Sequence, residues 1–109
     1  MVGNIHRVRT SSPGAPITVD DGVLPASAAD PGRMGVTRFT VAVGAASVPE
    51  RHESHELWLV EAGRGEVAYD GDRFTVGPGA MVYVEPWHEH GVRNVGDEPL
   101  AIFSVWWKR

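Results

Sequence analysis

Glycine and proline interrupt this chain so often that long helices are excluded. The 109 residues include 13 Gly and 8 Pro, and both residue types break helices and mark turns. Between the breaks lie short apolar segments that recur about every ten residues, with no convincing helical period. Regularly spaced short strands joined by tight turns are typical of antiparallel sandwiches and small barrels. We therefore predict an all-β fold, a single small antiparallel β-barrel.

Most of the expected strands lie after residue 35. An alternating segment begins at Val36, and a closing segment of bulky residues ends at Trp107. Asp70 and Gly71 form an Asp-Gly pair, which is a strong signal for a tight β-hairpin. The expected strands are 36–43, 57–60, 66–69, 73–76, 80–84 and 100–107.

The first 35 residues differ in composition from the rest of the chain. They are rich in small residues and breakers, and only 5–8 and 17–19 have the pattern of short strands. A chain of 109 residues has room for one hydrophobic core rather than two. We predict one domain, in which an N-terminal arm of residues 1–35 packs on a barrel formed by residues 36–109.

Composition excludes several classes of function. With 14 Asp and Glu against 10 Lys and Arg, the formal charge is −4, which does not suit a nucleic-acid or anionic-membrane binder. The absence of Cys removes disulfides, thiol nucleophiles and thiolate metal sites. No apolar run approaches the ~20 residues of a membrane helix. We expect a cytoplasmic protein that binds neither nucleic acid nor membrane.

Four of the five histidines lie between residues 52 and 90, with carboxylates around them. In an extended segment Glu50, His52 and Glu56 share one face, whereas His55 faces the other way. Neutral imidazole and carboxylate groups are the usual ligands of zinc, iron, manganese and nickel where no thiol is present. The pattern predicts metal ligands on the first face and a surface or interface role for His55.

A second cluster surrounds His88 and His90, where the chain is turning. His90 is a candidate to supply another imidazole to the same interior. His88 is either a proton shuttle at the mouth of the pocket or an exposed loop residue, because imidazole is suited to proton transfer near neutral pH.

The spacing within the first cluster resembles the first motif of the cupin superfamily, whose members are small double-stranded β-helix barrels. That motif reads His-x-His, three or four residues, Glu, six residues, Gly. Six residues separate Glu56 from Gly63, and three separate His52 from Glu56. One position departs from the motif, since Glu50 stands where the first His is expected.

The second cupin motif begins with Gly, continues through Pro and ends with His, three residues and Asn. Gly79, His90 and Asn94 occupy these positions, and Pro86 lies one residue later than expected. The two motifs agree with the sequence in order and spacing. The resemblance implies a double-stranded β-helix, jelly-roll-like barrel.

The resemblance also implies a metal site. One divalent ion, either Zn, Fe, Mn or Ni, would be held by His52, Glu56 and His90. Glu50 is either a fourth ligand or a surface residue. A carboxylate that points into a barrel is costly unless it is paired, so in a metal-free version Glu56 would need an arginine partner, for which the candidates are Arg38 and Arg93.

Aromatic side chains are expected around the predicted site. Trp58 shares parity with Glu56 and is expected to line the cavity, and Trp87 is expected to stand at its rim. Tyr83 is a third candidate for the substrate pocket, with a structural role as the alternative. Aromatic walls suit a flat or ring-shaped substrate.

Both faces of the segment 57–60 are apolar, since Leu57 and Leu59 alternate with Trp58 and Val60. A strand of this kind in a small barrel needs a covering arm or a partner subunit. Homodimers are common among cupins, so the resemblance favours a homodimer, with the N-terminal arm as the alternative cover.

Two functions from different classes follow from these features. The first is a metal-dependent enzyme of specialised metabolism that acts on a small organic molecule. Its metal would serve as a Lewis acid for isomerase, cyclase, lyase or rearrangement chemistry, or as an oxygen-activating iron. Glu50 or His88 would act as its acid or base. The second is a non-catalytic cupin that binds a small molecule, or an accessory subunit of a separate enzyme.

Overall fold

The structure is a computed structural model that describes residues 6–9, 11, 14–25, 27 and 32–108. The regular elements in these residues are β-strands, which confirms the all-β prediction. No helix among them is long and apolar enough to cross a membrane. The strands are β1 His6–Arg9, β2 Ile17–Val23, β3 Met34–Val41, β4 His55–Ala62, β5 Gly65–Tyr69, β6 Asp72–Val76, β7 Met81–Val84, β8 His90–Asn94 and β9 Leu100–Trp107.

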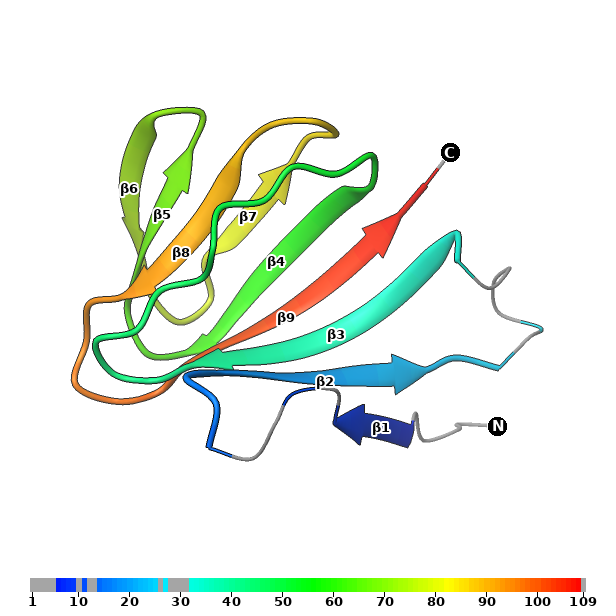
Figure 1. The fold of residues 1–109 in the computed structure, drawn as a ribbon, viewed down its shortest axis with the longest axis horizontal. Helices are drawn as coiled ribbons and strands as arrows, with labels where there is room; N and C mark the ends of the chain where they lie inside the picture. The colour runs from blue at the N-terminus through cyan, green and yellow to red at the C-terminus, as the bar shows by residue number, and fades with distance from the viewer. Residues whose placement is uncertain (1–5, 10, 12–13, 26, 28–31, 109) are drawn as a thin grey trace.

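The strands form two antiparallel sheets with one core between them (Figure 1). The large sheet has the strand order β1-β2-β3-β9-β4-β7, and the small sheet has the order β6-β5-β8. Alternate residues of each strand point to the same side, so both sheets contribute apolar side chains to the core. The largest fully buried side chains are Leu100, Ile102, Val41, Val60, Val67 and Val84.

The described part of the N-terminal segment forms the edge of the large sheet. β1 pairs with β2, and β2 pairs with β3 along nearly its whole length. β3 itself begins at Met34, so the sheet runs without interruption across the boundary expected at residue 35. β3 also ends at Val41, two residues before the expected end. Ile17 of β2 packs against the core, which places this segment next to the barrel interior.

Two turns depend on glycine. Asp70 and Gly71 have positive φ angles of 48° and 88° and join β5 to β6, which confirms the expected hairpin. Gly63 also has a positive φ, 86°, and a Cβ there would lie 2.7 Å from the carbonyl oxygen of Pro99. A side chain at position 63 would therefore both strain the backbone and collide with the loop before β9.

β8 is not among the strands expected from the sequence. It contains a glycine and only one large apolar residue, Val92, so its local strand signal is weak. In the structure it pairs with β5, and a backbone bridge between Glu50 and His90 extends the sheet on its other side. Pairing with distant segments, rather than local preference, determines this strand.

Asn94 joins the end of β8 to the large sheet. Its side-chain nitrogen donates hydrogen bonds to the carbonyl oxygens of Val41, at 2.9 Å, and Glu98, at 2.8 Å. Its side-chain oxygen accepts a hydrogen bond from the backbone N–H of Gly96 at 2.8 Å. Asn94 is buried, so these bonds satisfy a polar group in the core and fix the turn that leads to β9.

Candidate metal centre

The chain crosses from the small sheet to the large sheet between residues 50 and 56. Glu50 is bridged to His90 by two backbone hydrogen bonds of 2.9 and 3.0 Å. The carbonyl oxygen of His52 accepts a bond of 2.8 Å from the backbone N–H of Trp87. A bend follows, and Glu56 then lies on β4. The crossing brings side chains from the 50–52 segment, β4 and the start of β8 to one place.

Glu50, His52 and His90 form a group of side chains that can hold a metal ion. Each offers one ligand atom, and these atoms all lie within 4.8 Å of one another. His90 is buried, His52 is half-buried and Glu50 is exposed. The group is therefore closed on the β8 side and open on the Glu50 side, which leaves access for a small molecule.

Backbone carbonyl groups orient both imidazoles. His52 Nδ1 lies 3.0 Å from the carbonyl oxygen of Ser54, and His90 Nδ1 lies 2.9 Å from that of His88. A carbonyl oxygen only accepts hydrogen bonds, so each Nδ1 carries the proton and donates it. In the neutral imidazole Nε2 then has a free lone pair. In metal sites, a hydrogen bond donated by the ring nitrogen that does not bind the metal orients the histidine ligand.

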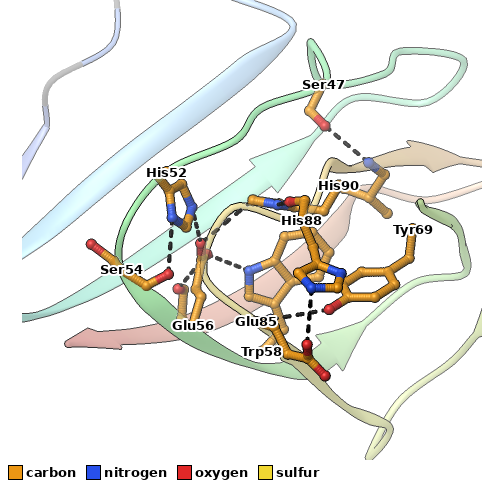
Figure 2. A network of polar contacts seen from close by, with 11 residues as sticks. Ser47, His52, Ser54, Glu56, Trp58, Tyr69, Glu85, His88 and His90 are labelled. Atoms are coloured by element: carbon orange, nitrogen blue, oxygen red, sulfur yellow. Dashed lines mark hydrogen bonds and ion pairs between the residues drawn. The ribbon is translucent and has the colours of Figure 1, made fainter. Parts of the chain in front are cut away.

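Glu56 faces both imidazoles. Its Oε1 lies 3.0 Å from His52 Nε2 and 3.7 Å from His90 Nε2. Its Oε2 accepts hydrogen bonds from Trp58 Nε1 and from Ser104 Oγ, the latter at 2.7 Å. Figure 2 shows Glu56 between the His52 ring and the Trp58 indole. Two donors thus fix one oxygen and direct the other at the histidines.

This arrangement fits a divalent cation. Glu50, His52 and His90 offer ligand atoms within 4.8 Å of one another, and Glu56 Oε1 lies 3.0 and 3.7 Å from the two Nε2 atoms. Carboxylate oxygens and imidazole lone pairs are all acceptors, and acceptors this close in a partly buried site need a proton or a cation between them. The arginine alternative is not realised, because Arg38 pairs with Glu61 at 2.9 Å and Arg93 lies 3.9 Å from Glu66. Imidazole nitrogen and carboxylate oxygen form a donor set suited to zinc, iron, manganese or nickel.

Two cavities adjoin this cluster. The first, of about 170 Å³, is mainly apolar, and its lining includes Trp58 together with residues of β2 and β3. The second, of about 320 Å³, is more open, and its lining includes Ser54, Ser104 and Lys108. Glu50 and Glu56 line both cavities. The candidate ligands therefore lie where the apolar cavity meets a wider one with a larger polar share in its lining, named the polar cavity for that reason.

The three aromatic candidates lie in different places. Trp58 is buried and lines the apolar cavity. Trp87 is 63% exposed and lines neither of the two cavities. Tyr83 differs from the expectation of a pocket residue, because it lies opposite Leu57 in the β4–β7 ladder and so faces away from the core. Trp106, which had no assigned role, lines the polar cavity.

His88 is held between carboxylates outside both cavities. Its Nδ1 contacts Asp70 Oδ2, and its Nε2 lies 3.0 Å from Glu85 Oε2. Its ring stacks on Tyr69 with a centroid distance of 5.5 Å (Figure 2). Both ring nitrogens are therefore engaged away from the candidate ligands. Its carbonyl group reaches the site instead, since it accepts the bond from His90 Nδ1.

His55 lies on the outer face of the large sheet, as the alternation along the strand predicts. Its ring stacks on Trp107 at a centroid distance of 5.2 Å, and its Nδ1 lies 2.6 Å from the Tyr83 hydroxyl. Trp106 and Trp107 likewise point to opposite sides, the first to the polar cavity and the second to His55. One histidine and one tryptophan are thus separated from the candidate metal centre by the sheet itself.

Sequence reasoning missed two groups of residues at this site. Ser104 holds Glu56, and Phe39 lies edge-on to Trp58 with a centroid distance of 5.6 Å. Ser104 is a single small polar residue inside a bulky strand, which is a signal for a buried hydrogen bond. The apolar lining from β2 was missed because a pattern within one strand does not show which strands become neighbours.

A family model agrees with the fold. The model of the Cupin domain matches residues 37–106. The match covers more than half of the chain, and the chain therefore belongs to the cupin family.

The chain is also similar to known proteins and solved structures. An uncharacterized protein of Methanocaldococcus jannaschii is 33% identical over 71 residues, which are 64% of this chain and 57% of that protein's own length. The structure of a Cupin 2 conserved barrel domain protein from Salinispora arenicola has 28% identity and a TM-score of 0.72, and the match covers 84% of this chain and 76% of the other. A predicted oxalate decarboxylase from Thermotoga maritima matches over 100% of both chains with a TM-score of 0.80. Its identity of 18% shows a shared fold alone.

Proposed function

We propose that this chain is a metal-dependent enzyme that acts on a small organic molecule. The observation that carries the proposal is the orientation of two imidazoles. His52 and His90 both donate Nδ1–H to backbone carbonyl groups, so both Nε2 atoms point at the Glu56 carboxylate. His52, His90 and Glu56 would hold the ion, and Glu50 would be the ligand or base on the open side.

The ion would polarise a carbonyl or hydroxyl group of the substrate as a Lewis acid, or, if it is iron, would bring oxygen chemistry to the site. The protein supplies the orientation of the ligand side chains. Ser104 and Trp58 hold Glu56 Oε2, which keeps that carboxylate turned toward the histidines. The Ser54 and His88 carbonyl groups keep the two imidazoles in the required tautomer.

Glu50 is the residue best placed to exchange a proton with a bound substrate. Its carboxylate lines both cavities and is exposed, and its backbone is fixed by the bridge to His90. A general base must come within hydrogen-bond reach of the substrate. Glu50 meets this condition for a molecule in either cavity, whereas His88 lines neither. The name of the Thermotoga maritima neighbour, a predicted oxalate decarboxylase, supports enzymatic use of this fold.

We further infer that the functional form is a homodimer that buries the outer apolar face, defined as Leu57, Leu59, Met81, Tyr83 and Phe103. All five side chains are exposed. They are cross-strand neighbours, because Tyr83 and Met81 lie opposite the two leucines, and Phe103 lies opposite Leu59 on β9. A contiguous apolar patch on a small protein marks an interaction site. A second copy of this chain would cover the patch with an equivalent one.

The enzyme proposal is tested by comparing metal-loaded, metal-stripped and Glu50→Gln protein on a mixed extract of small metabolites followed by mass spectrometry. The tag-free loaded protein is expected to consume at least one compound. Stripping the metal is expected to abolish that loss, and Glu50→Gln to slow it. An unchanged metal content in Glu50→Gln would assign Glu50 as the base, and a lower content would assign it as a ligand. A loaded protein that consumes nothing, or a stripped protein that works equally well, would contradict the proposal and favour a binding function.

A further inference from the structure

We propose that the ligand of this site has a flat, benzene-sized apolar ring at one end and a carbonyl or hydroxyl oxygen at the other. The inference rests on the proposed function for the placement of the oxygen beside the metal ligands. The inference that the ligand carries a ring depends on the apolar cavity alone. The two ends can therefore be tested separately.

The size of the apolar cavity sets the size of the ring. The cavity has a volume of about 170 Å³, and its apolar lining comes from Ile17, Val19, Phe39, Val48 and Trp58. A cavity of about 150 Å³ lined by apolar side chains accommodates benzene. A single six-membered ring fits this space.

The aromatic wall favours a flat ring over a saturated one. Phe39 and Trp58 meet at an interplanar angle of 70° with centroids 5.6 Å apart. The Trp58 indole is held in place by its hydrogen bond to Glu56, and it also meets the His90 ring at an interplanar angle of 71°. Ring faces and edges fixed in this way attract another aromatic ring beyond the effect of buried area alone.

Three polar residues of this cavity lie close together, since Glu56 Oε1 is 3.7 Å from His90 Nε2, and His90 and Glu50 offer ligand atoms within 4.8 Å of each other. Glu50, Glu56 and His90 line the cavity together with the apolar residues. The polar cavity continues from the same two glutamates to Ser54 and Ser104. A ring seated against β2 and β3 therefore directs its substituent at the candidate metal ligands. An oxygen substituent suits this end, because a hydroxyl group can donate to the Glu50 or Glu56 carboxylate, and a hydroxyl or carbonyl oxygen can bind a metal ion held there.

Three probe alcohols test the inference by NMR, with the Trp58 indole N–H as the reporter. Benzyl alcohol presents a flat ring and a hydroxyl group, cyclohexylmethanol a saturated ring, and glycerol no ring. We expect benzyl alcohol to bind about 2- to 10-fold more tightly than cyclohexylmethanol, and glycerol to leave the reporter unchanged. Phe39→Leu is expected to remove that preference. Phe74→Leu, which changes an exposed phenylalanine on the small sheet, is the matched control and is expected to retain it.

The result that overturns the inference is equal or weaker binding of benzyl alcohol relative to cyclohexylmethanol or glycerol, or no response of Trp58 to any ring compound in folded protein. Each titration is made on metal-stripped and on metal-loaded protein. Ring binding without any metal binding would support the cavity inference and contradict the enzyme proposal. Metal binding without ring binding would leave the enzyme proposal standing and overturn this inference.

Discussion

The inner and outer faces of β4 are both rich in apolar side chains, but they differ in what surrounds their polar residues. On the inner face Glu56 is held by Ser104 and Trp58 and faces two imidazoles. On the outer face His55 stacks on Trp107, and the leucines beside it are exposed. The inner face has a partly buried cluster of acceptors whose donor set suits a cation. The outer face has an exposed apolar surface.

One short segment of the chain places two histidines in different surroundings. His52 and His55 are three residues apart, yet only His52 joins the acceptor cluster. Side chains alternate along an extended chain, so neighbours in sequence reach opposite sides of the sheet. Residue type alone does not assign a role here, whereas the face of the sheet does.

The largest effect is expected from removing one inner histidine. His52→Ala should lower metal affinity by more than about 100-fold. Losing a residue that only hydrogen-bonds to a metal ligand already lowers metal affinity by ~10–100-fold, and His52 is a proposed ligand itself. His55→Ala, on the outer face, should leave the affinity unchanged. Metal content after equilibrium dialysis measures both. Equal loss in the two variants would show that the faces are not separated in function.

A smaller effect is expected from placing a charge on the outer apolar face. Phe103→Arg should weaken the dimer about 30-fold, equivalent to ~2 kcal/mol at an interface hot spot. Phe74→Arg is the control, because Phe74 and Phe103 have the same exposure of 43% but Phe74 lies on the small sheet. Sedimentation equilibrium gives both dissociation constants. A monomeric wild type would remove the role assigned to the outer face.

The smallest effect is expected from Ser104→Ala. The serine donates a hydrogen bond to Glu56 Oε2 and is buried, so its loss should loosen the carboxylate. We expect metal affinity to fall about tenfold, which is the lower end of the range for residues that hydrogen-bond to a metal ligand. The substitution leaves both imidazoles in place. Competition titration against a chelator measures the change. An unchanged affinity would mean that the Trp58 hydrogen bond alone orients Glu56.

Much of the fold was predictable because its signals are local. The Asp70-Gly71 hairpin requires positive φ at both residues, and the sequence supplies residues that tolerate it. Alternation along β4 separated the inward residues Glu56 and Trp58 from the outward residue His55. The spacing of the cupin motifs brought His52, Glu56 and His90 into one expected site.

The remaining features depend on which strands become neighbours. β8 has a weak local signal and forms because β5 and the Glu50 segment pair with it. Tyr83 faces outward because its position opposite Leu57 sets the side on which it lies. Phe39 lies at the site because the pairing of β3 with β9 places it beside Trp58. Registers between strands arise from the whole chain, so a pattern read within one segment does not contain them.

X-ray absorption spectroscopy of the zinc-loaded protein tests the central claim most directly. The account predicts that the ion is bound by two imidazoles, His52 and His90, with carboxylate oxygen completing the protein ligands. His55→Ala should give the same spectrum, and His90→Ala should lose one imidazole contribution or the ion itself. A protein that binds no metal, or a bound ion with no imidazole ligands, would contradict the account.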